Sequence, residues 1–292
     1  MMNLSTALVV ALLLTAAQMT VGGAGGGPEK QPPPAVAVQY KPAQEFVSLH
    51  EPIVVLFSVS NNLTKTITLT LGAQDIQFFD FALTSPTGQQ IQEYWNMERD
   101  VDLVTIGSGK VEMRPGETYE LPLLMNRWFH FDTPGTYFLT LRLTTHIGIS
   151  DGSSINPQSE TLRFTVQPRD RARLEKVCAA LAKEVAAAAN AAAAQEPARR
   201  LSYIDDPLAI PYLTRLLDYN KLTDHFVVAG LERIDTDDAV RALLAVLSSR
   251  QEDRERLSRG ALMRMQERIS DPTLKAAVKR ALTATNPEPQ GS

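Results

Sequence analysis

Between residues 35 and 168, apolar and polar side chains alternate with a period of two, the pattern of β-strands that bury one face. The apolar positions are rich in β-branched and aromatic residues, and turn sequences such as Ser85-Pro86-Thr87-Gly88 separate the runs. The clearest runs are 52–61, 65–72, 76–85, 88–95, 117–125, 135–145 and 160–168. Seven to nine short strands with no helix between them predict an antiparallel β-sandwich over residues 35–168.

One stretch of this region carries a more specific pattern. Phe131, Gly135, Tyr137, Leu139 and Leu141 form an F-x-x-x-G-x-Y-x-L-x-L run. The run resembles a segment that is common in bacterial immunoglobulin-like domains. The resemblance implies an immunoglobulin-like fold, and a tyrosine at this corner can bond its hydroxyl back across the turn. The two core cysteines of antibody domains are absent, because the chain has a single cysteine.

After residue 168 the apolar positions recur every three or four residues, which indicates helices. Residues 169–200 are strong helix formers with one apolar stripe. The stripe consists of Leu174, Val177, Cys178, Leu181 and Val185. The alanine-rich tract 186–194 has no large side chain and therefore buries little area. We predict a helical connector over residues 169–200.

Three later segments share an isoleucine, a polar or acidic cap and an amphipathic helix. They start at Ile204, Ile234 and Ile269. The second superposes on the first with an offset of 30 residues, and the third with an offset of 65. Alternating helices with a period in the thirties predict an α-solenoid over residues 201–284.

The helix caps follow the same register. Asp206 is suited to cap the first helix and Pro207 to begin it, because proline needs no N–H partner there. Asp271 takes the cap position of the third unit. In the second unit, Asp235 and Asp238 have capping-box spacing.

The first unit reads D-P-x-A-I-P-x-L-x-x-L-L between Asp206 and Leu217. This pattern resembles the bacterial HEAT repeat, including the subgroup first noticed in phycobilisome lyases, and the other two units match it less well. The resemblance implies a concave surface that is presented to another protein, and it carries no catalytic residues with it.

The two ends of the chain have a different composition. Residues 1–24 have the outline of a signal peptide, with an apolar stretch at 7–17 that is too short to span a bilayer. The stretch is preceded by no Lys or Arg, so an uncleaved N-terminal anchor is the competing interpretation. Residues 25–34 predict a flexible Gly/Pro linker, and residues 285–292 a disordered tail. We expect a secreted or periplasmic protein with no membrane span in the mature chain.

Composition and charge narrow the class of protein. The hydrophobic fraction is 44% and the charged fraction 21%, both ordinary for a soluble globular protein. The formal net charge is -4, with 9 Lys and Arg against 15 Asp and Glu up to residue 168, and 20 against 18 afterwards. Neither half has the basic excess of a nucleic-acid-binding surface, so no nucleic-acid partner is expected.

No catalytic, cofactor-binding or metal-binding residue can be assigned from the sequence, and no cofactor is expected. Cys178 lies in a predicted helix and is interpreted as a small buried apolar residue. The four histidines have none of the short spacings of a zinc site, and are interpreted as structural or surface residues. They are His50, His130, His146 and His225. His130 alternates with two phenylalanines, which predicts that it faces solvent.

Three other candidates have simpler interpretations. Gly107–Lys110 ends like a phosphate-binding loop but lacks the preceding glycine, and is interpreted as a hairpin turn. Residues 97–102 place three acidic side chains at alternate positions, which we interpret as a solvated strand face and not as a calcium loop. Trp95 and Trp128 are expected in packing roles. The adjacent Asp205 and Asp206 start a repeat, since Asp271 recurs in the same place.

These observations favour a non-enzymatic adaptor or scaffold that docks a protein partner, of unknown identity, through its β-sandwich and helices. Two alternatives stay open. The first is an accessory or inhibitory domain protein of an extracytoplasmic hydrolase. The second is an enzyme whose site is built from residues far apart in sequence, at the junction of the two domains.

Overall fold

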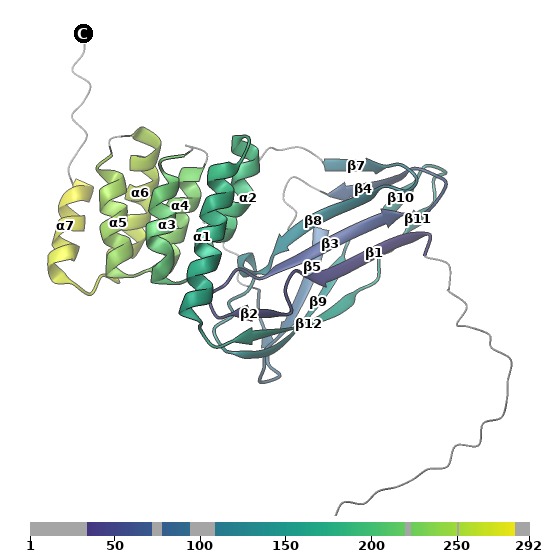
Figure 1. The fold of residues 1–292 in the computed structure, drawn as a ribbon, viewed down its shortest axis with the longest axis horizontal. Coiled ribbons are helices and arrows are strands. Elements are labelled where there is room, and N and C mark those ends of the chain that lie inside the picture. The colour runs from purple at the N-terminus through teal and green to yellow at the C-terminus, as the bar shows by residue number, and fades with distance from the viewer. Residues whose placement is uncertain (1–33, 72–77, 94–108, 220–222, 250, 284–292) are drawn as a thin grey trace, which may run out of the picture. The chain divides into compact units, whose positions relative to one another are not determined.

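The computed structural model describes residues 34–71, 78–93, 109–219, 223–249 and 251–283. An antiparallel β domain comes first and a helical domain follows it, as the hydrophobic periodicity predicts (Figure 1). The expected signal peptide, most of the linker, the C-terminal tail, Trp95 and the acidic segment 97–102 lie outside the described residues.

The β domain contains the following strands: β1 (Val36–Pro42), β2 (Phe46–Ser48), β3 (Val54–Asn61), β4 (Ile67–Leu71), β5 (Phe79–Thr84), β6 (Gln90–Ile91), β7 (Gly109–Met113), β8 (Thr118–Leu124), β9 (Gly135–Leu143), β10 (Ile147–Ile149), β11 (Ser154–Ile155) and β12 (Glu160–Gln167). Each of the seven predicted runs contains one of them. The predicted runs do not include β1, β2, β7, β10 or β11.

The strands form three sheets with the orders β1-β3-β8, β11-β10-β4-β7 and β2-β12-β9-β5-β6. Neighbouring strands are antiparallel, with the exception of the parallel pair β2 and β12. Alternate residues of β3, β4, β9 and β12 are buried and contribute to one apolar core. The alternation places one side of each strand in the core and the other in solvent.

The predicted corner is present at the start of β9. The Tyr137 hydroxyl donates a hydrogen bond to the Thr133 carbonyl at 2.7 Å, and the ring stacks on Phe164 at 5.8 Å between centroids. Gly135 has φ 145°, and a Cβ at this position would lie 2.5 Å from the Cβ of Pro86. Glycine is therefore required at this turn both for its backbone angle and for space. The expected bond of the tyrosine hydroxyl across the turn is confirmed.

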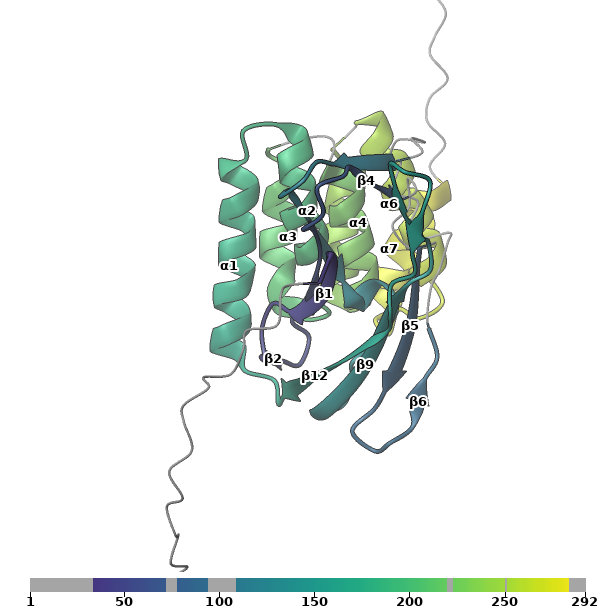
Figure 2. The same ribbon diagram turned by 90° about the vertical axis from the view of Figure 1, so that its right-hand side faces the viewer.

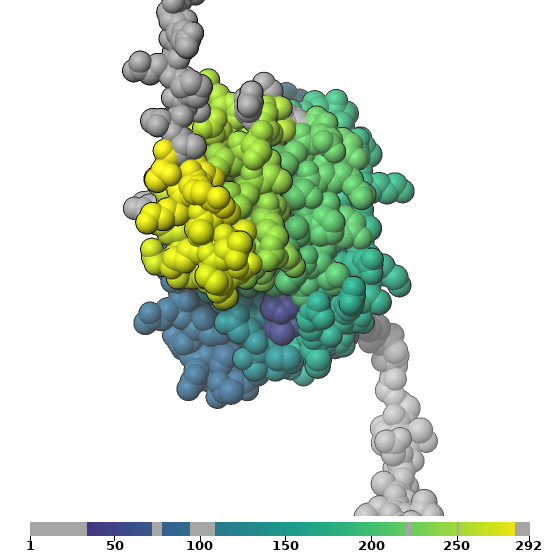
Figure 3. Space-filling model, turned by 90° about the vertical axis from the view of Figure 1, so that its left-hand side faces the viewer, coloured from purple at the N-terminus to yellow at the C-terminus, as the bar shows by residue number. Residues whose placement is uncertain are grey.

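The helical domain contains α1 (Arg171–Ala187), α2 (Ala191–Ser202), the short 3₁₀ helix η3 (Pro207–Ala209), α3 (Ile210–Leu216), α4 (Asp224–Ile234), α5 (Asp237–Leu247), α6 (Glu252–Met265) and α7 (Pro272–Thr283). The helices stand side by side in two layers (Figures 1 and 2). In one layer α1 contacts α3, α3 contacts α5 and α5 contacts α7, whereas in the second layer α2 contacts α4 and α4 contacts α6. Figure 3 shows α7, in yellow, on the surface at the end of this array.

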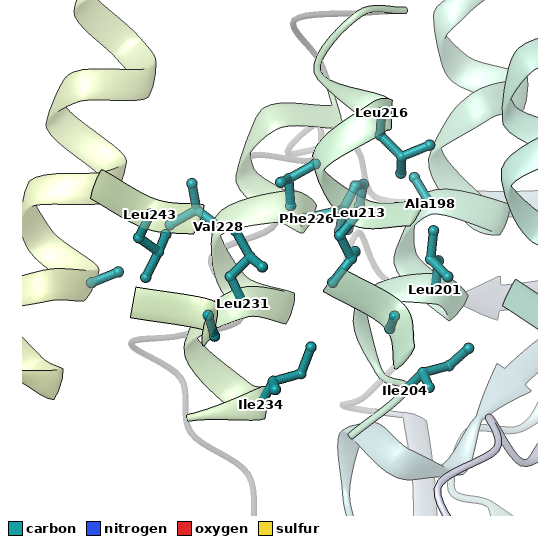
Figure 4. Close-up of a cluster of buried hydrophobic side chains, with 14 of the residues drawn as sticks. Ala198, Leu201, Ile204, Leu213, Leu216, Phe226, Val228, Leu231, Ile234 and Leu243 are labelled. Carbon is teal, nitrogen blue, oxygen red and sulfur yellow. The ribbon is translucent and has the colours of Figure 1, made fainter. Parts of the chain in front are cut away.

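The three isoleucines that define the repeat take equivalent places in the helical core. Ile204, Ile234 and Ile269 are all buried. Leu213 and Leu243, which the offset of 30 aligns, are fully buried between the two layers. Figure 4 shows Leu213, Leu243 and the isoleucines Ile204 and Ile234 packed with residues of the second layer such as Leu201, Phe226 and Leu231. The register found in the sequence therefore describes equivalent positions in space.

The predicted cap residues are present in two of the three units. Asp206 accepts a hydrogen bond from the Leu208 N–H at 3.0 Å, and Asp271 accepts one from the Thr273 N–H at 2.8 Å. In the second unit the expected capping pair is wrong. Asp235 ends α4 with a left-handed backbone, φ 49°, and Thr236 caps α5 instead. Thr236 is the residue that the offset of 30 aligns with Asp206, so the cap position is kept and only the residue type differs.

The connector over residues 169–200 is two helices that belong to the helical core. α1 ends at Ala187, and Asn190 starts α2 by accepting a hydrogen bond from the Ala193 N–H at 2.9 Å. Most of the alanine tract is exposed, whereas Ala194 and Ala198 are buried against the other helices. Asparagine interrupts the alanine run because its side chain satisfies an N–H at the new helix start. Among the described residues, no helix is long and apolar enough to cross a membrane.

Candidate functional site

The two aspartates that precede η3 have different surroundings. Asp206 is bound by Arg169 through two hydrogen bonds, with Nε at 2.5 Å and Nη2 at 3.1 Å. Burial acts to raise the pKa of Asp206, but the hydrogen bonds from Arg169 and the Leu208 N–H outweigh it and lower that pKa below its ordinary value. Asp206 is therefore an ionised helix cap that is paired with Arg169. It has the role that the repeat predicts.

Asp205 points toward a small polar pocket of about 30 Å³ between the β domain and the helices. His50, His130 and Asp132 line the pocket from the β domain, and Asp205 and Arg233 line it from the helices. Burial raises the pKa of Asp205, while the positive charges of His50 and Arg233 oppose the shift. The pocket is large enough for about one water molecule. Its other lining residues are Asn126, Phe129, Phe131 and Tyr203, so charged and aromatic side chains meet at this contact between the domains.

Residues from Pro34 onward form one compact unit, and several polar contacts join the β domain to the first helix. Arg173 of α1 donates to the buried Glu51 carboxylate at 2.5 Å and to the Phe46 carbonyl at 2.7 Å. The Asp170 N–H donates to the Ser48 hydroxyl at 2.8 Å. A buried carboxylate requires such a partner, because an unpaired charge is costly in the interior.

A hollow with a volume of about 470 Å³ lies between α1 and α3. Its rim carries Arg169, Arg171 and Arg215, and Tyr212 lies on the α3 side. Its remaining lining residues are Glu175, Asp206, Pro207, Leu208 and Pro211. Within the described residues, the side chains of Arg171, Arg215 and Tyr212 have no hydrogen-bond or ion-pair partner. The hollow thus combines an apolar floor with unpaired cations, a composition suited to binding an anionic group.

The sequence analysis did not find this hollow. Its signal was available in the repeat, because the residues aligned with Tyr212 and Arg215 in the second unit are Ala242 and Ala245. Tyrosine and arginine at these two places are therefore not needed for the helices to pack. The contribution of Arg171 could not be recognised, since it depends on α1 lying beside α3.

The other candidates lie apart from this hollow. Cys178 is buried in the helical core, as predicted, and burial raises the pKa of its thiol to about 12. Trp128 is buried in the β core, and His130 is exposed beside two buried phenylalanines, both as predicted. His225 packs on Phe226 in α4, and His146 contacts Asn156 in the β domain. Among the described residues, no group of three His, Cys, Asp or Glu side chains is arranged to hold a metal ion.

The predicted turn at Gly107–Lys110 is only partly covered by the described residues. Gly109 and Lys110 begin β7, and Gly107 and Ser108 lie outside the described part of the chain. The described half is a strand that pairs with β4, with Lys110 opposite Thr70. This part of the segment therefore has the backbone of a sheet.

The fold defines a class of protein in which a β-sandwich precedes a two-layered helical array. Residues 38–167, which cover the β domain, match the family of the flagellar collar protein C N-terminal domain. Comparison with curated proteins finds no match.

Solved structures similar to this chain match about half of it at low identity. The sporulation control protein Spo0M from Bacillus subtilis is 12% identical, with a TM-score of 0.24, over 52% of this chain and 54% of that protein. A β-glucosidase from Listeria innocua is 13% identical, with a TM-score of 0.21, over 46% of this chain and 16% of the enzyme. Structural similarity at this level does not assign a function.

Proposed function

We propose that this protein is a non-enzymatic, extracytoplasmic component of a flagellum-associated assembly, in which it connects protein partners. The match of residues 38–167 to a flagellar collar protein domain carries the proposal. The matching family is named for a flagellar collar, and we infer a related structural role for this domain. The export-like N-terminus supports a location outside the cytoplasm.

The helical domain supports the connecting role. Two layers of helices, stacked in register, form an extended surface of the kind that α-solenoids use to bind other proteins. We propose that residues 201–284 are HEAT-like repeats and that they bind one partner, while the β domain binds another. The inter-domain contacts of Arg173 and Asp170 would hold both binding surfaces in one unit.

The proposal is tested in the native organism with the full-length protein carrying a C-terminal epitope tag. Envelope crosslinking followed by mass spectrometry should recover flagellar structural proteins, and gold-labelled antibody should collect at the flagellar base. A strain with an in-frame deletion should lose a density around the flagellar base in electron cryotomograms, and the wild-type gene should restore it. A uniform distribution over the envelope, or an unchanged density in the deletion strain, would reject the flagellar role.

A further inference from the structure

The hollow between α1 and α3 is built from two helices of the same layer. Arg171 and Glu175, four residues apart, lie on one face of α1, and Tyr212 and Arg215 lie on one face of α3. Pro207, Leu208 and Pro211 supply an apolar floor between them. The hollow is thus open to groups that carry both a charge and some apolar surface.

The charges of the hollow are not balanced within the molecule. Arg169 is neutralised by Asp206, to which it is bound at 2.5 Å. Arg171 and Arg215 are both exposed, and among the described residues neither forms an ion pair. Glu175 is an unpaired anion in the lining, so two free cations face one free anion. Two arginines that each have unused donors can receive a carboxylate in fork geometry.

The repeat shows that these side chains are not a requirement of the fold. Alanine takes the place of Tyr212 in both of the other units, at Ala242 and Ala277. The place of Arg215 is taken by Ala245 in the second unit and by Arg280 in the third. The tyrosine and both unpaired arginines come together only in the first unit.

We propose that the hollow between α1 and α3 binds an acidic segment of a partner protein, with Arg171 and Arg215 receiving its carboxylates and the apolar floor receiving the side chains between them. The proposal rests on the interaction role proposed above and identifies the surface and the chemistry of one partner. The Tyr212 hydroxyl supplies a further donor at the edge of the site. Nucleic acid is a poorer occupant, because stable binding requires more phosphate contacts than two free arginines provide.

The test uses the full chain and two fluorescein-labelled hexapeptides, one alternating glutamate with leucine and the other alternating glutamine with leucine. Fluorescence anisotropy should show saturable binding of the acidic peptide, weakened by added salt as charge screening requires. The double variant R171E/R215E should bind it at least about tenfold more weakly. The variant Y212A should also bind more weakly. Circular dichroism verifies that each variant is folded.

A matched control separates this site from general electrostatic attraction. R256E/R280E reverses two exposed arginines on α6 and α7 and makes the same change in net charge. It should alter the affinity by less than about twofold, since these residues do not line the hollow. Equal weakening by both double variants would overturn the proposal, and so would equal binding of the neutral peptide. Displacement of the peptide by an equal concentration of inorganic phosphate would show a small-anion site and would also overturn it.

The result is distinguishable from the test of the flagellar role. If R171E/R215E no longer binds the acidic peptide in vitro while the wild-type protein shows no association with flagella in cells, the proposed binding site is correct and the proposed function is wrong. If the double variant is recovered with the same flagellar partners as the wild-type protein and binds the acidic peptide normally, the proposed function stands without this site.

Discussion

The substitution Gly230→Ala tests how closely the helices of the array approach each other. Gly230 lies in the middle of α4, where alanine is normally the better residue. A Cβ built at this position would lie 2.9 Å from Cδ1 of Leu213 and 3.0 Å from the backbone Cα of Ser202. The Leu213 side chain could turn away, but the backbone of α2 could move only together with its helix. Gly230 therefore permits a close contact of α4 with both neighbouring helices.

The chain contains a matched control for this substitution. Gly260 lies within α6, and a Cβ there would meet only the end of the flexible Arg264 side chain, at 3.5 Å. Gly260→Ala should stabilise the helical domain by about 1 kcal/mol through helix propensity alone. Gly230→Ala gains the same amount and loses about 1 to 3 kcal/mol through overpacking. The difference between the two variants is the steric cost, because the propensity contribution cancels.

Urea denaturation followed by circular dichroism at 222 nm reports on the helical domain. A difference of about 2 kcal/mol should separate the two midpoints by about 1 M urea, for a slope of about 2 kcal/mol per molar. Both tryptophans, Trp95 and Trp128, precede the helical domain, so their fluorescence follows the β domain as an internal reference. Equal midpoints for the two variants would refute the close approach of α4 to α2 and α3.

Three further predictions concern other parts of the molecule. Tyr137→Phe should destabilise the β domain by about 1 kcal/mol, because it removes the hydroxyl bond across the corner, while the exposed Tyr219→Phe should have no effect on urea denaturation. Asp206→Asn should destabilise the protein at neutral pH and Asp205→Asn should stabilise it, since the pKa of Asp206 is lowered by folding and that of Asp205 is raised. The effect of Asp206→Asn should diminish as the pH falls below about 4, whereas the effect of Asp205→Asn should diminish earlier, as the pH falls through the raised pKa of Asp205 toward about 4. Equal signs at neutral pH would contradict the assignment. The thiol of Cys178, whose pKa burial raises to about 12, should react with Ellman's reagent only after unfolding, and reaction in the native protein would show that it is accessible.

The sequence predicted the elements whose pattern is local. Strands such as β3 and β9 alternate along most of their length, because each buries one of its two faces. The shorter strands β2, β10 and β11 have two or three residues, too few to show a period. β2 and β10 are strands because they pair with β12 and β4, which lie far away in the chain, and β11 pairs with the neighbouring β10.

The caps illustrate the same limit within one element. Asp206 was recognisable because aspartate before proline is a local signal of a helix start. At the second unit the local signal was ambiguous, since three of the four residues 235–238 are aspartates and Thr236 stands between two of them. The left-handed backbone of Asp235, which ends α4, determines that the next helix is capped one residue later.

The sequence by itself determined the division near residue 168, the helical or extended type of each long segment, and the register of the repeat. These properties follow from the backbone preferences of neighbouring residues and from the spacing of apolar residues along each helix or strand. Only the tertiary structure decided that Asp206 is bound by Arg169, 37 residues away, while the adjacent Asp205 faces His50 of the β domain. The hollow between α1 and α3 has the same origin. Its charges come from segments that no sequence period connects, and they meet because the helices of one layer pack side by side.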